Sequence, residues 1–183
     1  MRRFLSSATP IRGQRVLLRV DFNAPIRGRR VIDDFRIRET LPTIRHLLAR
    51  DNTLIFLAHH SNRRQSLAPV AAHLGRLLRR PIRFVKDPFR RDAEAIHGSG
   101  LFFLENLRFW PGEEAASRAF AEDLGRLGEV FINDAFGVAH RQAASVSVLP
   151  HILPSWLGFL FKKELEAFDR LLRRPRRPLV AVF

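Results

Sequence analysis

Short apolar runs alternate along the chain with segments in which apolar residues recur every three or four positions. The runs VLLRV, LIFLA, LFFL and VFIN have the length and the large apolar side chains of buried strands. The segments between them have the spacing of amphipathic helices. Strands that alternate with helices favour parallel pairing in βαβ units. The pattern therefore predicts an α/β fold, a three-layer α/β/α sandwich around a Rossmann-like parallel sheet.

The predicted elements can be placed by residue number. Strands are expected at about 15–21, 53–58, 82–85, 101–104, 129–133 and 178–183, and helices at about 34–48, 66–78, 91–96, 113–128 and 161–172. Asp34 and Ser66 are the predicted N-caps of the first two helices, and Gly128 is expected to end the helix that Glu113 opens. Residues 134–158 show no clear period, and we expect them to wrap around a site.

Polar and basic residues follow each of the main apolar runs. These groups are Asp21-Phe22-Asn23, His59 to Arg63, Glu105 to Arg108, and Asp134 to Arg141. Ligands of open parallel sheets bind beyond the carboxyl ends of the strands, so the groups should converge, with Arg36 on their rim. Guanidinium groups suit phosphate geometry. The arrangement predicts one positively charged site for a phosphorylated, acidic small molecule.

Composition restricts the class of protein. The chain has 183 residues, 46% of them hydrophobic, which suits one core of ordinary size. Its net charge is +14, and 29 of its 32 basic residues are arginine. That charge could serve nucleic acid, but no motif of a nucleic-acid-binding fold is present, and genomic base composition is the favoured explanation. The absence of cysteine excludes disulfides and thiolate metal sites.

Targeting signals and metal sites are not expected. The longest apolar stretch, residues 148–161, is broken by prolines and is too short to span a bilayer, so a cytoplasmic protein with its mature N-terminus is expected. Neighbouring residues at a strand end point to opposite faces, and no third ligand is spaced for zinc, so His59 and His60 are not read as metal ligands. We assign His59 a structural role. Asp33 and Asp34 are read as capping residues.

The chain resembles the N-terminal half of phosphoglycerate kinase along essentially all of its length. The stretches that carry this resemblance are, in order, RVLLRVDFNAP, DFRIRETLPTI, ENLRFWPGEE, INDAFGVAHR, GFLFKKELEAF and RRPLVAVF. The resemblance implies a bilobal kinase of glycolysis that moves a phosphoryl group reversibly between 1,3-bisphosphoglycerate and ADP, giving 3-phosphoglycerate and ATP. The N-terminal lobe would hold the glycerate phosphate, and the C-terminal lobe the magnesium nucleotide.

The resemblance also implies a domain division. Residues 1–160 would form the phosphoglycerate-binding domain, 161–175 the interlobe helix, and 176–183 the first strand of a nucleotide-binding lobe whose remainder lies beyond Phe183. Bound Mg-ADP or Mg-ATP would belong to that lobe. We expect these 183 residues to bind glycerate phosphate but to be inactive without a chain that supplies the C-terminal lobe.

Site roles follow from the resemblance position by position. Asp21 and Asn23, with Phe22 between them, would bind the hydroxyl and carboxylate region of the glycerate. Arg36 would be catalytic and would stabilise the phosphoryl group during its transfer. A second set would hold the non-transferred phosphate or line its loop: His60, Ser61, Asn62, Arg63, Arg108 and Arg141. A third set would support the site: Asn106, Gly137 and His140.

One loop departs from the family pattern. The family usually has Ser-His-Leu-Gly-Arg-Pro, whereas this chain reads HHSNRR at residues 59–64 and lacks the glycine and proline. Asn62 can take the positive φ of the glycine at some cost, so the loop is expected to form. Two alternatives remain: a non-catalytic phosphate- or RNA-binding module built on this fold, and a truncated inactive product.

Overall fold

The computed structural model describes residues 3–90, 96, 98–173, 177 and 180. Its centre is a six-stranded sheet in the order β5-β6-β4-β1-β7-β8. Every neighbouring pair in this sheet is parallel. The strands are β1 (Arg15–Arg19), β4 (Thr53–Leu57), β5 (Arg83–Val85), β6 (Leu101–Leu104), β7 (Val130–Asn133) and β8 (Ser155–Leu157).

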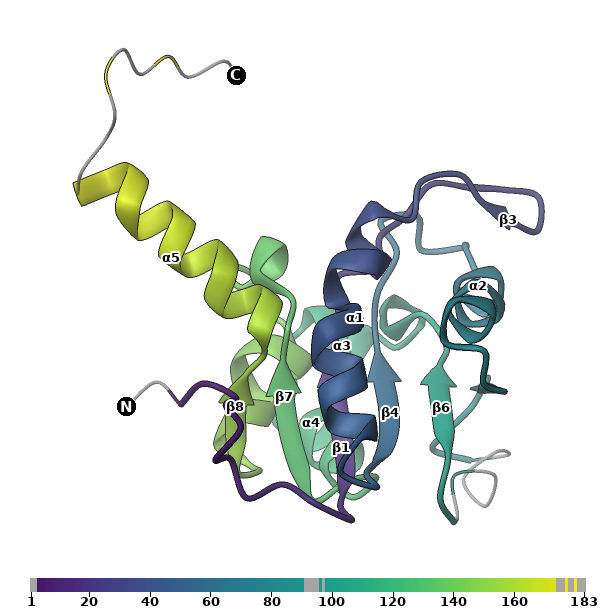
Figure 1. Cartoon of the computed structure of the whole chain (residues 1–183). Helices are drawn as coiled ribbons and strands as arrows, with labels where there is room; N and C mark the ends of the chain where they lie inside the picture. The colour runs from purple at the N-terminus through teal and green to yellow at the C-terminus, as the bar shows by residue number, and fades with distance from the viewer. Residues whose placement is uncertain (1–2, 91–95, 97, 174–176, 178–179, 181–183) are drawn as a thin grey trace.

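Helices connect the strands and cover both faces of the sheet. They are α1 (Phe35–Leu48), α2 (Ala68–Leu78), α3 (Pro111–Glu114), α4 (Arg118–Gly125) and α5 (Phe159–Arg173). Shorter helical turns are η2 (Leu107–Phe109), η3 (Phe136–Val138), η4 (Ala144–Val148) and η5 (Leu149–His151), and a small hairpin pairs β2 (Ile26–Arg27) with β3 (Arg30–Val31). Figure 1 shows α1 in front of the strands, with the hairpin and α5 beyond their carboxyl ends.

The core is divided by the sheet into two clusters. Val16 and Leu18 point to the face covered by α1 and α2, whereas Leu17 between them points to the face covered by α4 and η5. The same alternation along β4 and β7 extends both clusters across the sheet. Strands buried on both faces explain why their sequences are continuous apolar runs. The predicted three-layer α/β fold with a parallel sheet is confirmed.

Of the two predicted N-caps, Asp34 lies at the predicted position and Ser66 does not. Asp34 occupies the N-cap position of α1, but its side chain makes no cap hydrogen bond and pairs instead with Arg38 and His73. Asp33 accepts from the backbone N–H of Phe35 at 2.9 Å. Helix α2 begins at Ala68, so Ser66 lies one residue before the N-cap, although its hydroxyl still accepts from the Ala68 N–H at 3.2 Å.

The single helix predicted for residues 113–128 is two helices. Ala116 has φ of 47°, which ends α3, and Ser117 begins α4 as an N-cap that accepts from the Phe120 N–H. Gly128 does not end α4, which stops at Gly125. A Cβ on Gly128 would lie 2.7 Å from Leu17 Cγ, so this glycine allows the loop to pass close to β1.

The segment predicted to be irregular, residues 134–158, contains η3, η4, η5 and strand β8. Strand β8 was missed because it has three residues, Ser155–Leu157, directly after a proline, too few to show an alternation. The helix predicted at 161–172 is α5, which begins two residues early, at Phe159. The helix predicted at 91–96 and the strand predicted at 178–183 lie almost wholly outside the described residues.

Helix α5 is joined to the sheet by a buried carboxylate. Asp134, directly after β7, accepts from the backbone N–H of Phe161 at 2.9 Å, and a Cβ on Gly158 would overlap this carboxylate. Thr43 of α1 accepts from the Phe159 N–H at 3.1 Å. Burial raises the pKa of Asp134 to about 6, against the opposing effect of its hydrogen bonds. The first turn of α5 is therefore fixed to β7 and α1 before the helix extends away from the sheet (Figure 1).

Candidate functional site

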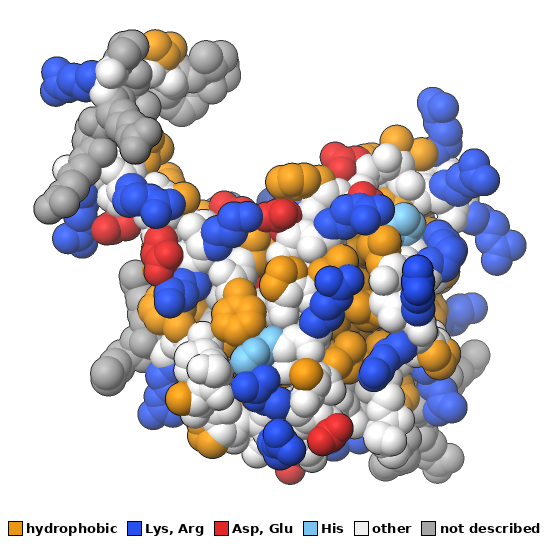
Figure 2. All heavy atoms as spheres, viewed as in Figure 1, with side chains coloured by type: hydrophobic (Ala, Val, Ile, Leu, Met, Phe, Trp, Pro, Cys, Tyr) orange, Lys and Arg blue, Asp and Glu red, His pale blue; other side chains and the backbone are white. Residues whose placement is uncertain are grey.

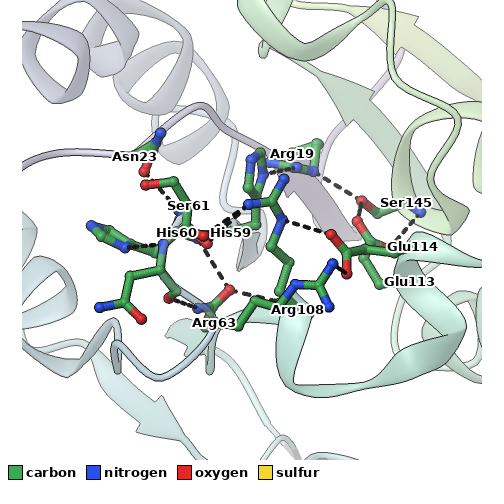
Figure 3. A network of polar contacts seen from close by, with 12 residues as sticks. Arg19, Asn23, His59, His60, Ser61, Arg63, Arg108, Glu113, Glu114 and Ser145 are labelled. Carbon is green, nitrogen blue, oxygen red and sulfur yellow. Dashed lines mark hydrogen bonds and ion pairs between the residues drawn. The ribbon is translucent and has the colours of Figure 1, made fainter.

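The register of the sheet brings the ends of three strands together. Arg19, the last residue of β1, lies beside Leu57 of β4 and Asn133 of β7. The segments that follow these strands must therefore leave the sheet at the same edge. Their polar side chains form the network in Figure 3, which α3 and η4 complete from the same end of the molecule.

Arg19 is the centre of this network and is only 1% exposed. Its Nε donates to Ser145 Oγ at 2.9 Å, and its Nη1 donates to the Val20 carbonyl at 2.6 Å. Ser145 in turn gives both its hydroxyl and its backbone N–H to the buried carboxylate of Glu113 (Figure 3). Burial lowers the pKa of Arg19, and the carboxylate of Glu113 opposes that shift. A buried charge of this kind is stable only with such partners.

His59 completes the coordination of Arg19. Its Nδ1 lies 2.6 Å from Arg19 Nη2, and the side chain is 4% exposed. Burial lowers the pKa of His59 to about 3, and the positive charge of Arg19 adds to the shift. The imidazole is therefore neutral at neutral pH, in an environment that already contains several arginines.

Two of the predicted phosphate-binding arginines converge on one carboxylate. Arg63 Nη2 lies 2.7 Å from Glu114 Oε2, and Arg108 Nε lies 3.3 Å from Glu114 Oε1. Arg108 also donates from Nη1 to the Ser61 carbonyl at 3.1 Å. Burial lowers the pKa of Arg108, against the attraction of Glu114. Glu114 thus places an anionic group between two guanidinium groups (Figure 3).

A cavity of about 270 Å³ lies against this network. Its lining combines three arginines, one histidine and two carboxylates with smaller side chains: Arg19, His59, Arg108, Glu113, Glu114, Arg141, Gln142, Ala143 and Val146. Ligand pockets commonly have volumes of roughly 300–1,000 Å³. This cavity is close to the lower end of that range, so its size and its cationic groups suit a small anion.

Asn106 shapes the loop that carries His60 and Arg63. This side chain is fully buried, and its Oδ1 accepts from the backbone N–H groups of His60 and Arg108. Its Nδ2 donates to the Gln65 carbonyl at 3.0 Å. Asn62 is not among the described non-glycine residues with positive φ, so the loop forms without the left-handed residue that we expected at this position.

The ring of His60 is held by backbone groups of the same region. Its Nδ1 accepts from the Asn62 N–H at 3.0 Å, and its Nε2 lies 3.2 Å from the Ala24 carbonyl. Ser61 is linked to Asn23, whose Oδ1 accepts from the Ser61 N–H at 2.9 Å. These contacts join the segment after β1 to the loop after β4.

Asp21 and Arg36 form a separate ion pair at the rim. Arg36 Nη1 donates to Asp21 Oδ2 at 2.5 Å, and the Arg36 side chain is 55% exposed. A Cβ on Gly137 would lie 2.8 Å from the same Asp21 oxygen, so η3 approaches this carboxylate closely. Asp21 Oδ1 is buried without a hydrogen-bond partner among the described residues. The pair therefore leaves most of the Arg36 guanidinium accessible.

Comparison with known proteins agrees with this arrangement of motifs and strands. A sequence profile of the phosphoglycerate kinase family matches residues 7–183. The chain belongs to the phosphoglycerate kinase family. Curated phosphoglycerate kinases of Thermus thermophilus and Thermomicrobium roseum are each 44% identical to it, over 180 and 179 residues. The crystal structure of phosphoglycerate kinase from Pyrococcus horikoshii is similar with a TM-score of 0.86 and 30% identity.

The chain covers one half of these phosphoglycerate kinases. The match to the Thermus thermophilus enzyme spans 93% of this chain and 46% of the relative, and the match to the Pyrococcus horikoshii structure spans 97% of this chain and 47% of the other. Phosphoglycerate kinase from Coxiella burnetii gives the same picture, with a TM-score of 0.82 over 96% and 46% of the two chains. The chain thus spans about half the length of the relatives that it matches.

Of the residues expected from the family resemblance, only Arg108 and Arg141 line the cavity itself. Phe22 is fully buried and stacks on Phe103 inside the sheet core, so its side chain does not line the site. His140 is exposed and borders a different, mostly apolar groove formed with Phe136 and α5. Phe22 follows a strand that is buried on both faces, which explains why its aromatic ring turns inward.

Sequence reasoning missed several members of the network, most of them buried. Arg19, Glu113, Glu114 and Ser145 were not selected, and His59 was selected only as structural. The signal that could have found Arg19 is its place inside a strand whose other residues are apolar, where an arginine needs buried partners. Those partners lie 40 and 126 positions away in the chain, so no local motif connects them.

The described part of the chain offers neither a metal cluster nor a membrane span. Within residues 3–90, 96 and 98–173, no group of three or more His, Cys, Asp or Glu side chains is placed to hold a metal ion. None of the described helices is long and apolar enough to cross a bilayer.

Proposed function

We propose that this chain is the phosphoglycerate-binding half of a phosphoglycerate kinase that works in the cytoplasm. It would hold 3-phosphoglycerate or 1,3-bisphosphoglycerate while a phosphoryl group passes between that ligand and ADP or ATP, as in glycolysis. Membership in the family and the cationic strand-end cluster support this proposal.

The convergence of arginines on Glu114 and on the cavity is the observation that supports phosphate binding. Arg63 and Arg108 already share the carboxylate of Glu114, and Arg108 and Arg141 line the same cavity. Guanidinium groups that converge on one anion in the free protein are arranged to bind a phosphate that replaces it. The non-transferred phosphate would therefore enter beside Arg108 and displace Glu114. Asp21 and Asn23 would hold the glycerate end of the ligand.

Arg36 is proposed as the catalytic residue. Its guanidinium is more than half exposed and is anchored at one nitrogen by Asp21. A permanently charged group at this rim could stabilise the charge that spreads over the equatorial oxygens of a transferring phosphoryl group. The contribution of this chain to catalysis would be positioning and electrostatic stabilisation, with no covalent intermediate.

The proposed domain division assigns residues 1–160 to glycerate phosphate binding, 161–175 to the interlobe helix and 176–183 to the nucleotide-binding lobe. Helix α5 supports the assignment, because it begins at the sheet and then extends away from it (Figure 1). Mg-ADP or Mg-ATP would bind to the nucleotide-binding lobe, and the residues proposed above would bind and orient the glycerate phosphate. Residues 1–183 alone should give no ATP in an ADP-coupled assay, and robust turnover would contradict this division.

The alternative function, RNA binding by the basic chain, depends on how the Lys and Arg side chains are distributed over the surface. Figure 2 shows Lys and Arg side chains spread over the visible face among hydrophobic and polar ones, rather than gathered in one stripe. The affinity for a single-stranded RNA oligonucleotide should therefore be weak and should fall steeply as the salt concentration rises.

The melting temperature of the chain is the direct test of the proposed phosphoglycerate binding. Added 3-phosphoglycerate should raise the melting temperature, whereas glycerate, which lacks the phosphate, should not. Equal shifts with both ligands would overturn the proposal.

A further inference from the structure

The β2–β3 hairpin presents three arginines to solvent, and none of them lines the cavity. Arg27, Arg29 and Arg30 are all exposed, two of them in the paired strands and one in the turn between them. None of the three forms an ion pair with an acidic side chain in the described part of the chain. In Figure 2, Lys and Arg side chains project at the upper right, where Figure 1 places this hairpin. The positive charge of the hairpin is therefore accessible to a partner.

Two large apolar side chains follow the hairpin directly. Ile32 is 61% exposed and Phe35 is 67% exposed. The Ile32 N–H donates to the Pro25 carbonyl at 2.9 Å, which closes the base of the hairpin. Asp33 Oδ1 accepts from the Phe35 N–H at 2.9 Å, so a tight turn keeps Phe35 close to the hairpin. Exposed apolar side chains rimmed by polar ones are a feature of protein and membrane interaction sites. We define the hairpin surface as Arg27, Arg29, Arg30, Ile32 and Phe35.

The acidic residues near the hairpin surface do not cancel its charge. Residues 25–38 contain five arginines and two aspartates, which gives a net charge of +3. Of the two aspartates, Asp34 already pairs with Arg38 at 2.8 Å and with His73 at 2.8 Å. Helix α5, which also exposes large apolar side chains, carries four basic and three acidic residues. The hairpin surface thus combines exposed apolar groups with a larger excess of positive charge than α5.

We propose that the hairpin surface binds the anionic surface of a lipid bilayer. The arginines lie among the negatively charged headgroups, while Ile32 and Phe35 enter the boundary with the acyl chains. A projecting hairpin suits a flat partner, whereas single-stranded nucleic acid is bound in grooves with aromatic side chains on which bases stack. The hairpin surface has one aromatic and one aliphatic residue, and it lies beyond the strands of the sheet (Figure 1). Lipid binding at this surface does not depend on glycerate phosphate binding in the cavity.

Sedimentation with lipid vesicles tests the proposal on the full 183-residue chain. Vesicles of phosphatidylcholine and phosphatidylglycerol in equal parts should bind the chain saturably, and the affinity should fall as added salt screens the headgroup charge. Vesicles of phosphatidylcholine alone should bind at least about tenfold more weakly. Absence of binding to the anionic vesicles by the folded chain would overturn the proposal.

Two matched pairs of substitutions separate the hairpin surface from the general basic charge of the chain. Arg29→Gln with Arg30→Gln should weaken binding to the anionic vesicles by about fivefold per arginine. The control, Arg118→Gln with Arg126→Gln, removes two other exposed arginines and should change the affinity by less than about twofold. Equal weakening by the two pairs would show attraction by net charge alone and would overturn the proposal.

A second comparison tests the apolar part of the surface. Ile32→Ser with Phe35→Ser keeps the charge and should weaken vesicle binding by about tenfold or more, because these side chains leave water when the chain docks. Leu171→Ser with Leu172→Ser removes exposed apolar side chains of α5, and this control should bind as the parent chain does. Because all four side chains are exposed, the melting temperatures should stay close to that of the parent chain. Unchanged vesicle binding by the Ile32, Phe35 pair would overturn the proposal.

Insertion of the apolar side chains can be observed directly. The chain has no cysteine, so a single Ile32→Cys variant can carry an environment-sensitive fluorophore at the hairpin surface. Anionic vesicles should shift its emission to shorter wavelength, and the same label on an Arg126→Cys variant should not shift. A single-stranded RNA oligonucleotide is the competitor. RNA binding that is tighter than vesicle binding and is lost in both hairpin variants would assign the surface to nucleic acid and overturn the proposal.

Discussion

The strand-end residues fall into an inner set and an outer set that differ in burial. The inner set is buried and consists of Arg19, His59, Glu113, Asp134 and Ser145. The outer set reaches solvent; the side chains of Arg36 and Arg63 are 55% and 69% exposed. Inner residues contact one another or backbone groups, whereas Arg36 and Arg63 each contact a single carboxylate.

The same edge of the sheet can serve both stability and ligand binding because its two sets of residues differ in burial. Buried charges are costly unless they are paired, so the inner set can hold only one arrangement. Exposed ion pairs contribute little, so the outer arginines can leave their carboxylates when a ligand arrives. The inner set therefore fixes the positions from which the outer set binds.

Replacing Arg19 should have the largest effect. Arg19→Met leaves the buried carboxylate of Glu113 without its nearby guanidinium, and the free energy of unfolding should fall by about 3–5 kcal/mol. The matched outer variant, Arg36→Met, should change it by less than about 1 kcal/mol. Urea unfolding of both variants measures the contrast, and similar losses for the two would remove the distinction between the sets.

The pH dependence of Asp134 is the next largest effect. Because the pKa of this carboxyl is about 6 in the folded chain and about 3.9 unfolded, the folded state holds its proton more tightly. The resulting stability is fully present below the unfolded pKa and is lost as pH rises through about 6. It amounts to about 3 kcal/mol.

Asp134→Asn should abolish this pH dependence while keeping an oxygen for the Phe161 N–H. The measurement is the difference in unfolding free energy between the parent chain and the variant from about pH 4 to pH 7. A difference that stays constant across this range would show that Asp134 titrates normally and does not belong with the inner set.

Removing the charge of Glu114 should have a smaller effect, and it should strengthen rather than weaken the binding of 3-phosphoglycerate. Glu114→Gln frees Arg63 and Arg108 from a competing anion, so the affinity for 3-phosphoglycerate should rise by up to about fivefold. Glu122→Gln is the control, because Glu122 pairs with Arg118 outside the cavity. Weaker binding by the Glu114 variant, measured by calorimetry, would show that this carboxylate positions the arginines rather than competing for them.

The main strands of the fold could be predicted from the sequence, whereas the residues of the inner set could not, and the reasons are physical. Continuous apolar runs are what a doubly covered parallel sheet requires, so the main strands were found. The turn at Ala116, with its positive φ, has no sequence signal, so the break between α3 and α4 was missed. The strand-end rule brought Arg63 and Arg108 to one region, where both contact Glu114.

Arg19 and His59 show where sequence reasoning stops. Each has a local explanation, as a strand residue and a loop histidine, and only the packing of distant segments reveals that they touch. Asn62 shows the reverse error: a loop assumed to need a left-handed residue forms without one, because the buried Asn106 holds it at several backbone groups.

The most direct test of the proposed substrate site is calorimetric titration of the full 183-residue chain with 3-phosphoglycerate at moderate salt. The comparison is with an Arg36→Ala, Arg108→Ala double variant, and with an Arg118→Ala, Arg126→Ala variant that removes the same charge outside the cavity. Our account predicts saturable binding that the first variant loses and the second retains. Equal weakening in both variants, or no binding by the folded parent chain, would contradict it.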